Sequence, residues 1–180
     1  QGFIVPTDAE LILFADIVAK IRSGQAALAD GLAAQFGFEL VQYSDRADNN
    51  SIEWLLREIK PIRKGWGLYI FRSSAAHDII LEAPHPLADE GTAVIAAKIY
   101  QALQARALLV AGAHRDANLD RSADVAHHAQ SIFEAVHEAI TKTSSTIVLQ
   151  IHGFAASKHP GYPQVVLSSA PTQEQLVVNN

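Results

Sequence analysis

The chain has 180 residues, 49% hydrophobic and 18% charged, which is enough apolar sequence to bury a sizeable core. Its formal net charge of −5, with no Lys/Arg stripe, argues against nucleic-acid binding, and no apolar run approaches the roughly 20 residues of a membrane span. There is no Cys, which excludes disulfides, thiolate catalysis and Cys-type metal sites, so that His, Asp and Glu must bind any catalytic metal.

The first part of the chain is predicted to be helical. Thr7 and Glu10 form the T-x-x-E pattern of a capping box, ahead of an apolar-periodic run through Ile21. An Ala/Leu-rich segment then continues to about Phe36, where Gly37 can end it.

The next segments are predicted to be a strand, a polar loop and a short helix. The strand is FELVQYS, and the loop is DRADNN. The helix is IEWLLREI, capped by Ser51 and ended by Pro61. We expect a single domain over residues 1–180. Residues 1–60 could be a helical N-terminal addition to it, although no linker marks a boundary.

From residue 65 onward, strands and helices alternate. The predicted strands are GLYIFR, DIILEA, ALLVAG, TIVLQIHG and QVVLS, and the predicted helices are TAVIAAKIYQALQ and DVAHHAQSIFEAVHEAI. This alternation predicts an α/β fold of three layers, αβα, in which the central sheet is mixed but largely parallel.

Three of these strands are each followed by a histidine or end in one. His85 follows DIILEA, His114 follows ALLVAG, and His152 ends the apolar part of TIVLQIHG. Because reactive groups gather at the carboxyl ends of strands in open α/β sheets, we expect these histidines to lie near a functional site.

The pattern around His85 and His152 indicates a zinc site. Catalytic zinc takes three protein ligands from His and carboxylates and leaves a fourth position for water. His85 and either Asp89 or Glu90 would supply two ligands from one loop, in which Gly91 allows the backbone to turn, and His152 would supply the third.

Plainer explanations exist for each of these residues. A single histidine at a strand end is more often a surface residue than a ligand, and Asp89 and Glu90 could simply favour the first turn of a helix. His128 and His137 are predicted to lie on the solvated face of their helix, whereas His127 could face the cleft.

The same segments resemble zinc hydrolases of the exopeptidase-like fold: carboxypeptidase-type enzymes, N-formylglutamate amidohydrolases, N-acetylmuramoyl-alanine amidases and phage poly-γ-glutamate hydrolases. HPLADEGT is similar to the H-x4-E-x-G-T loop of the poly-γ-glutamate hydrolases. FEAVHEAITKTSSTIVLQIHGF is similar to the helix-to-strand passage of the formylglutamate enzymes, and IHGFAASKHPGYP to the carboxypeptidase segment with a ligand histidine. The resemblance covers about residues 68–168.

The resemblance implies which acid would bind the metal. The H-x-x-E pattern of carboxypeptidases is missing, because position 88 is Ala. The acid ligand is then Glu90, at the spacing of the poly-γ-glutamate enzymes, or Asp89, if one counts back from Thr92. The longer side chain of Glu90 favours it slightly.

The resemblance also implies roles for other polar residues. Arg115 and Arg121 would bind a substrate carboxylate through the planar guanidinium, with Asn118 adding a hydrogen bond, unless these arginines pair with neighbouring aspartates. Tyr162 could polarise a carbonyl. The general base would be Glu174, the acid of the 89–90 pair that is not a ligand, or a residue outside these 180.

The sequence therefore predicts a zinc-dependent hydrolase that cleaves an amide or peptide bond near a substrate carboxylate. The substrate would be a small acylated amino acid or a peptide. The alternative is a metal-binding or structural α/β domain without turnover. The missing initiator Met and the absence of Cys favour a secreted or periplasmic protein, although a chain without Cys also suits the cytosol.

Overall fold

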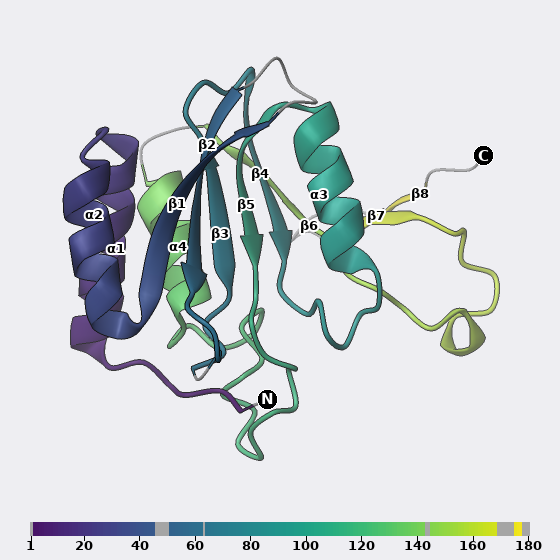
Figure 1. Ribbon diagram of the computed structural model, residues 1–180. Coiled ribbons are helices and arrows are strands. Elements are labelled where there is room, and N and C mark those ends of the chain that lie inside the picture. Colours follow the sequence, from purple (N-terminus) through teal and green to yellow (C-terminus); the bar gives the residue numbers. More distant parts are fainter. Residues whose placement is uncertain (1, 46–50, 63, 143–144, 169–174, 178–180) are drawn as a thin grey trace.

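A computed structural model describes residues 2–45, 51–62, 64–142, 145–168 and 175–177 and has a six-stranded sheet at its centre (Figure 1). The strands are β1 (Phe38–Asp45), β2 (Ser51–Glu58), β3 (Leu68–Arg72), β4 (His77–Ala83), β5 (Ala105–Val110) and β6 (Ile147–Gln150). Their order across the sheet is β1-β2-β3-β5-β4-β6.

The sheet is mixed, but the prediction that it is largely parallel is wrong. The pairs β1/β2, β2/β3 and β3/β5 are antiparallel, and only β4/β5 and β4/β6 are parallel. The short connections between β1, β2 and β3 cannot contain a crossover helix, so these neighbours must run in opposite directions. The parallel strands are the ones joined through helices.

Helices cover both faces of the sheet, as predicted. The helices are α1 (Asp8–Arg22), α2 (Ala26–Ala33), α3 (Thr92–Ala102) and α4 (Ile132–Thr141), with two short 3-10 turns at Ala34–Phe36 and Ala156–Lys158. Helix α3 packs on β4 and β5 from one side, and α1, α2 and α4 lie on the other (Figure 1). A separate two-stranded sheet, β7 (Val166–Ser168) with β8 (Gln175–Val177), follows β6.

The predicted start and stop of the N-terminal helices are confirmed. The Thr7 side chain accepts a hydrogen bond from the Glu10 backbone N–H, and the Glu10 carboxylate accepts one from the Thr7 N–H. Gly37 ends the second helical segment with φ of 75°, in the left-handed region that favours glycine.

Residues 51–58 form β2, so the helix predicted there is wrong. β2 pairs with β1 on one side and β3 on the other. Trp54 and Leu56 pack against the helical layer, while Glu53 and Leu55 lie on the opposite face. Trp54 and Leu56 alternate as in a strand, although Leu55 between them is also apolar, and pairing on both edges outweighs helix propensity. Residues 1–60 therefore supply two strands of the central sheet as well as helices.

The helix predicted over residues 124–140 is shorter than expected. It begins at Ile132, because the Ser131 side chain accepts a hydrogen bond from the Glu134 N–H and caps the helix there. Residues 124–131 form turns instead. This difference matters for the site, because the turns place Asp124 and His127 beside His85.

Candidate metal centre

The candidate site lies at the edge of the sheet where the parallel strands end. His85 follows β4, and His152 follows β6, its parallel neighbour. Asp89 lies in the loop between β4 and α3, where Gly91 adopts φ of 82° just before the helix begins. The sheet topology thus brings together residues that are 67 positions apart in the chain.

Three ligand atoms face one another at this edge. His85 Nδ1 lies 3.6 Å from Asp89 Oδ2, and His152 Nδ1 also lies 3.6 Å from the same oxygen. The rings of His85 and His152 have centroids 5.1 Å apart. Of the polar atoms that the structure describes, His85 Nδ1 is one of the few that are buried without a hydrogen-bond partner. An unpartnered buried nitrogen next to a carboxylate is the arrangement that a bound cation would satisfy.

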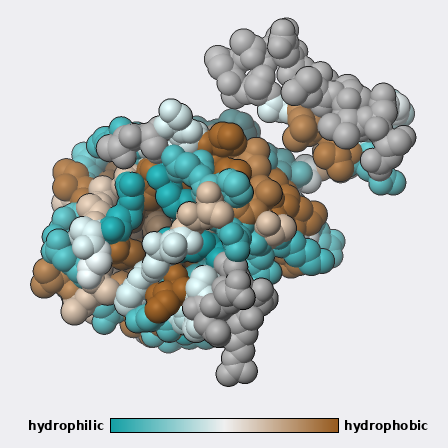
Figure 2. Space-filling view, turned by 90° about the horizontal axis from the view of Figure 1, so that it is seen from above, coloured by the Kyte–Doolittle hydropathy of each residue, from teal (hydrophilic) through white to brown (hydrophobic). Residues whose placement is uncertain are grey.

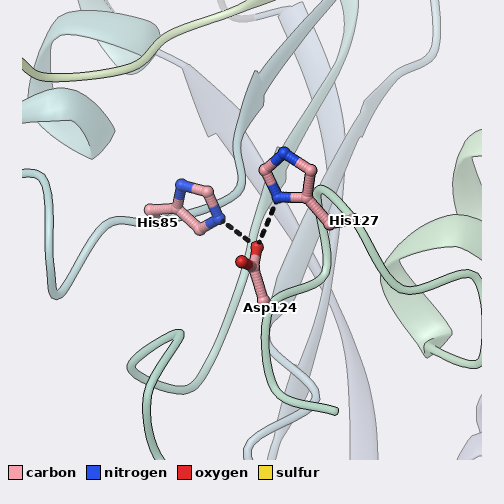
Figure 3. A group of neighbouring side chains, drawn as sticks. All are labelled: His85, Asp124 and His127. Atoms are coloured by element: carbon pink, nitrogen blue, oxygen red, sulfur yellow. Dashed lines mark hydrogen bonds and ion pairs between the residues drawn. The ribbon is translucent and has the colours of Figure 1, made fainter. Parts of the chain in front are cut away.

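The other nitrogen of His85 is held by Asp124. His85 Nε2 lies 2.8 Å from Asp124 Oδ1, and His127 Nδ1 lies 3.0 Å from the same oxygen (Figure 3). Burial alone would raise the pKa of Asp124, but the hydrogen bonds from His127 and His85 lower it to about 2. Asp124 is therefore a carboxylate at neutral pH, and it favours the His85 tautomer with the proton on Nε2 and a free lone pair on Nδ1.

Two triads could hold an ion, and their spacings differ. Ligand atoms bound to zinc at about 2.0–2.1 Å in tetrahedral geometry lie roughly 3.3 Å apart. The spacings from Asp89 Oδ2 to His85 Nδ1 and to His152 Nδ1, 3.6 Å each, are close to this value. In the triad of His85 Nε2, Asp124 and His127, the 2.8 and 3.0 Å spacings are those of hydrogen bonds. The first triad is thus the better candidate for the metal ligands, with Asp124 as a supporting residue.

The surroundings of His152 suit a candidate metal ligand. Burial and the neighbouring His85 lower the pKa of His152, which favours the neutral ring that a metal requires. The next residue, Gly153, donates its backbone N–H to Asp89 Oδ2 over 3.1 Å. A Cβ at position 153 would lie 3.1 Å from the Asp89 Cβ, so the loop approaches Asp89 closely only because this residue is glycine.

Between the two acids predicted as the third ligand, the structure brings Asp89 to the histidines and leaves Glu90 exposed. The Asp89 side chain is only 7% exposed. The Asp89 carbonyl accepts a hydrogen bond from the Thr92 hydroxyl, which fixes the turn before α3. The slight preference for Glu90 rested on the reach of its side chain, but here the turn itself carries Asp89 inward.

The two predicted arginines both border the site, and both have acidic neighbours. Arg115 Nη1 lies 3.7 Å from Asp89 Oδ1, with 41% of its side chain exposed. Arg121 Nη2 lies 3.2 Å from Asp124 Oδ2, and Arg121 adopts φ of 63°. A non-glycine residue in this region is uncommon and is found more often near functional sites than elsewhere.

Three further predicted residues lie elsewhere or outside the described residues. The Asn118 amide donates to the Phe3 carbonyl and to the Ser122 hydroxyl, so it links the N-terminal segment to the loop after β5. Tyr162 packs with Phe154 and His159 in the segment after β6. Glu174 lies outside the residues that the structure describes.

The sequence did not single out Asp124, Glu82, Gln150 or His137 as site residues. His137 was expected on a solvated helix face, but it is half-buried and its Nδ1 lies 2.6 Å from Glu82 Oε1. One signal was available: Glu82 and Gln150 are polar residues within otherwise apolar strands.

A cavity of about 340 Å³ opens at the other end of the sheet, away from the histidines. Arg22, Arg72 and Arg106 line it, but each already has a protein partner. Arg22 and Arg106 donate to the last carbonyls of α4, and Arg72 pairs with Glu53. The three arginines therefore serve in helix capping and buried ion pairing.

Figure 2, seen from above, shows hydrophilic and hydrophobic residues intermingled over the top of the molecule.

Comparison with known proteins gave no match to a protein-family model, a curated protein or a solved structure. Within the described residues, no helix is both long and apolar enough to cross a membrane.

Proposed function

We propose that the chain is a zinc-dependent hydrolase that cleaves an amide or peptide bond close to a carboxylate of its substrate, on a fold related to the zinc exopeptidases. The observation that supports this best is the convergence of His85 Nδ1, Asp89 Oδ2 and His152 Nδ1 from two parallel strand ends. Two histidines and a carboxylate form the ligand set of many catalytic zinc sites, which leave one position for water.

Each residue near the site has a role in this proposal. His85, Asp89 and His152 would hold the metal, and Asp124 orients the His85 ring. Zinc bound there would act as a Lewis acid and would lower the pKa of its bound water to about 7. The buried side chains of His85 and Asp89 keep bulk water from the inner side of the site.

The position of Arg115 supports the proposal that the substrate is acidic. Its guanidinium lies at the edge of the site and is partly exposed, so a substrate carboxylate could reach it. Arginine binds carboxylates in a planar, bidentate fashion. A small acylated amino acid, a peptide C-terminus, or a glutamyl or cell-wall peptide would place such a carboxylate near its scissile amide.

The second candidate function is a metal-binding domain without turnover. One observation favours it: Arg115 and Arg121 each have an internal carboxylate neighbour, Asp89 and Asp124. Their charges could therefore serve only to balance those acids.

The metal content of purified variants tests the proposed ligands. After exposure to zinc and desalting, wild-type protein should retain one equivalent by elemental analysis, and His152→Ala and Asp89→Ala should retain none. Glu90→Ala and His114→Ala are the matched controls and should retain zinc, because Glu90 is exposed, His114 neighbours Asp116, and neither belongs to the ligand triad. Zinc retained by Asp89→Ala and lost by Glu90→Ala would reverse the choice of acid.

Substrate preference tests the role of Arg115. Arg115→Ala should raise KM for substrates with a free carboxylate by about tenfold or more, since a charged hydrogen bond is lost, and should hardly affect amidated analogues. Steady-state kinetics on matched acid and amide pairs measure this. Arg57→Ala removes a surface arginine of β2 as a control. Equal effects on both substrates would make Arg115 a structural residue.

A further inference from the structure

A carboxylate is buried in the sheet beneath the candidate metal centre. The Glu82 side chain, in β4, is fully buried, and its Oε1 lies 2.6 Å from His137 Nδ1 on α4. Its Oε2 accepts a hydrogen bond from Gln150 Nε2 over 2.9 Å. No packing argument explains an acid at this position, because an apolar side chain would fill the same space without the cost of desolvating a charge.

The bond to Glu82 determines which way the Gln150 amide points. Glu82 and Gln150 are register partners in neighbouring parallel strands. Because Gln150 Nε2 is the donor to Glu82 Oε2, the Gln150 side chain turns its NH₂ group toward Glu82. Its carbonyl oxygen, Oε1, then faces His152 Nε2 at 3.4 Å.

That orientation selects a tautomer of His152. A carbonyl oxygen can only accept, so a hydrogen bond at this contact requires the proton on Nε2 of His152, which leaves the lone pair of Nδ1 free. His152 Nδ1 is the atom that faces Asp89 Oδ2. His85 shows the same pattern with one fewer residue, because Asp124 accepts directly from its Nε2.

We propose that Glu82, Gln150 and His137 form a positioning network that presents His152 Nδ1 to the metal, with Glu82 as its central residue. This inference rests on the proposed zinc site. Glu82 sets the Gln150 amide, the amide sets the His152 tautomer, and His137 holds Glu82 from the helical layer. Glu82 lies on the same buried face of β4 as the core residue Ile80 and is not itself a metal ligand. The network gives a reason for an acid at this buried position.

Zinc affinity in purified protein tests the network, measured by competition with a chromophoric chelator. Glu82→Gln keeps the shape but allows the Gln150 amide to reverse, and Gln150→Met removes the amide. Both should weaken zinc binding by about 10- to 100-fold, as is usual when the outer partners of metal ligands are lost. His137→Gln should have a smaller effect in the same direction. Glu53→Gln is the matched control, because Glu53 is a fully buried carboxylate in the same sheet that pairs with Arg72, away from the site.

A second readout needs no metal. Nitrogen-15 NMR of the imidazole rings in the metal-free protein should show His152 protonated on Nε2 in the wild type, and a larger Nδ1-protonated population in Glu82→Gln. If Glu82→Gln does not fold, His137→Gln and Gln150→Met carry both measurements.

The outcomes separate this inference from the proposed function. Unchanged affinity and tautomer in Glu82→Gln and Gln150→Met, in a protein whose wild type binds zinc and whose His152→Ala variant does not, would overturn the network alone. A wild type that binds no zinc would overturn both.

Discussion

Buried acidic side chains have different partners in the two halves of the sheet. In the antiparallel half, Glu53 and Arg72 are register partners and form an ion pair of 2.9 Å with both side chains almost fully buried. In the parallel half, the buried acids Glu82, Asp89 and Asp124 have histidines as their main partners. Arginine neutralises a carboxylate permanently, whereas a histidine, when it is neutral, leaves both a ring lone pair and the negative charge of the acid available. The second arrangement is the one that suits a metal ion.

The largest expected effects are a loss of stability in the antiparallel half and a loss of zinc binding in the parallel half. Glu53→Gln removes the carboxylate that balances the buried charge of Arg72, which should cost about 3–5 kcal/mol of unfolding free energy while zinc affinity stays unchanged. His85→Ala should abolish zinc binding with a smaller effect on the metal-free protein. Urea unfolding and zinc titration of both variants measure this. If Glu53→Gln also lost zinc, the two halves would be coupled and the comparison would fail.

A smaller effect is expected from the residue that supports His85. In Asp124→Asn, the new amide can donate to His85 Nε2, which would move the ring proton to Nδ1 and block the ligand atom. We expect zinc binding to weaken by about 10- to 100-fold. Asp120→Asn, in the same loop but exposed, is the control. An Asp124→Asn protein with wild-type affinity would show that Asp124 does not set the tautomer.

The close approach of the two ligand loops can be tested at Gly153. A methyl group there would lie 3.1 Å from the Asp89 Cβ and must displace it. Overpacking of this kind costs about 1 kcal/mol, so zinc affinity in Gly153→Ala should fall by about fivefold. Gly31→Ala, at a position with open space around it, should leave affinity unchanged. Chelator competition is sensitive enough for both.

The smallest expected effect is a pH dependence from His137. The hydrogen bond to Glu82 raises the pKa of His137, and the charges of Glu82, Glu134 and Glu138 act in the same direction, against desolvation. Protonated His137 therefore stabilises the fold below the unfolded-state pKa of about 6.5, and this contribution is lost as pH rises through the higher folded-state pKa.

Comparison of the metal-free wild type with His137→Gln measures that contribution. The difference in unfolding free energy should shrink from about pH 6 to about pH 9. Parallel curves over this range would mean that His137 does not titrate differently in the folded and unfolded protein.

The two halves of the sheet also differ in how well the sequence predicted them. The strands and helices after residue 65 were visible because mostly apolar strand segments alternate with helical patterns, and the ends of those strands could be compared directly. His85 and His152 were selected as candidate ligands in this way, and the structure brings them together. The strand β2 was not predicted, because Leu55 interrupts the alternation of Trp54 and Leu56 and makes the segment look helical.

The supporting residues were hidden for a different reason. Asp124 reaches His85 because residues 124–131 form turns and α4 begins only after Ser131, and the choice between Asp89 and Glu90 depends on the turn that Thr92 closes. Glu82 reaches His137 across two layers of the fold. Such contacts depend on tertiary structure, which a spacing rule along one segment does not encode.

The most direct test of the proposed metal centre is anomalous scattering at the zinc absorption edge from crystals of zinc-loaded protein. The arrangement of the ligand atoms predicts a single strong peak bound by His85 Nδ1, the Asp89 carboxylate and His152 Nδ1, at about 2.0–2.2 Å from each. A peak between Asp124 and His127 instead, or no peak near His85 in protein saturated with zinc, would contradict it.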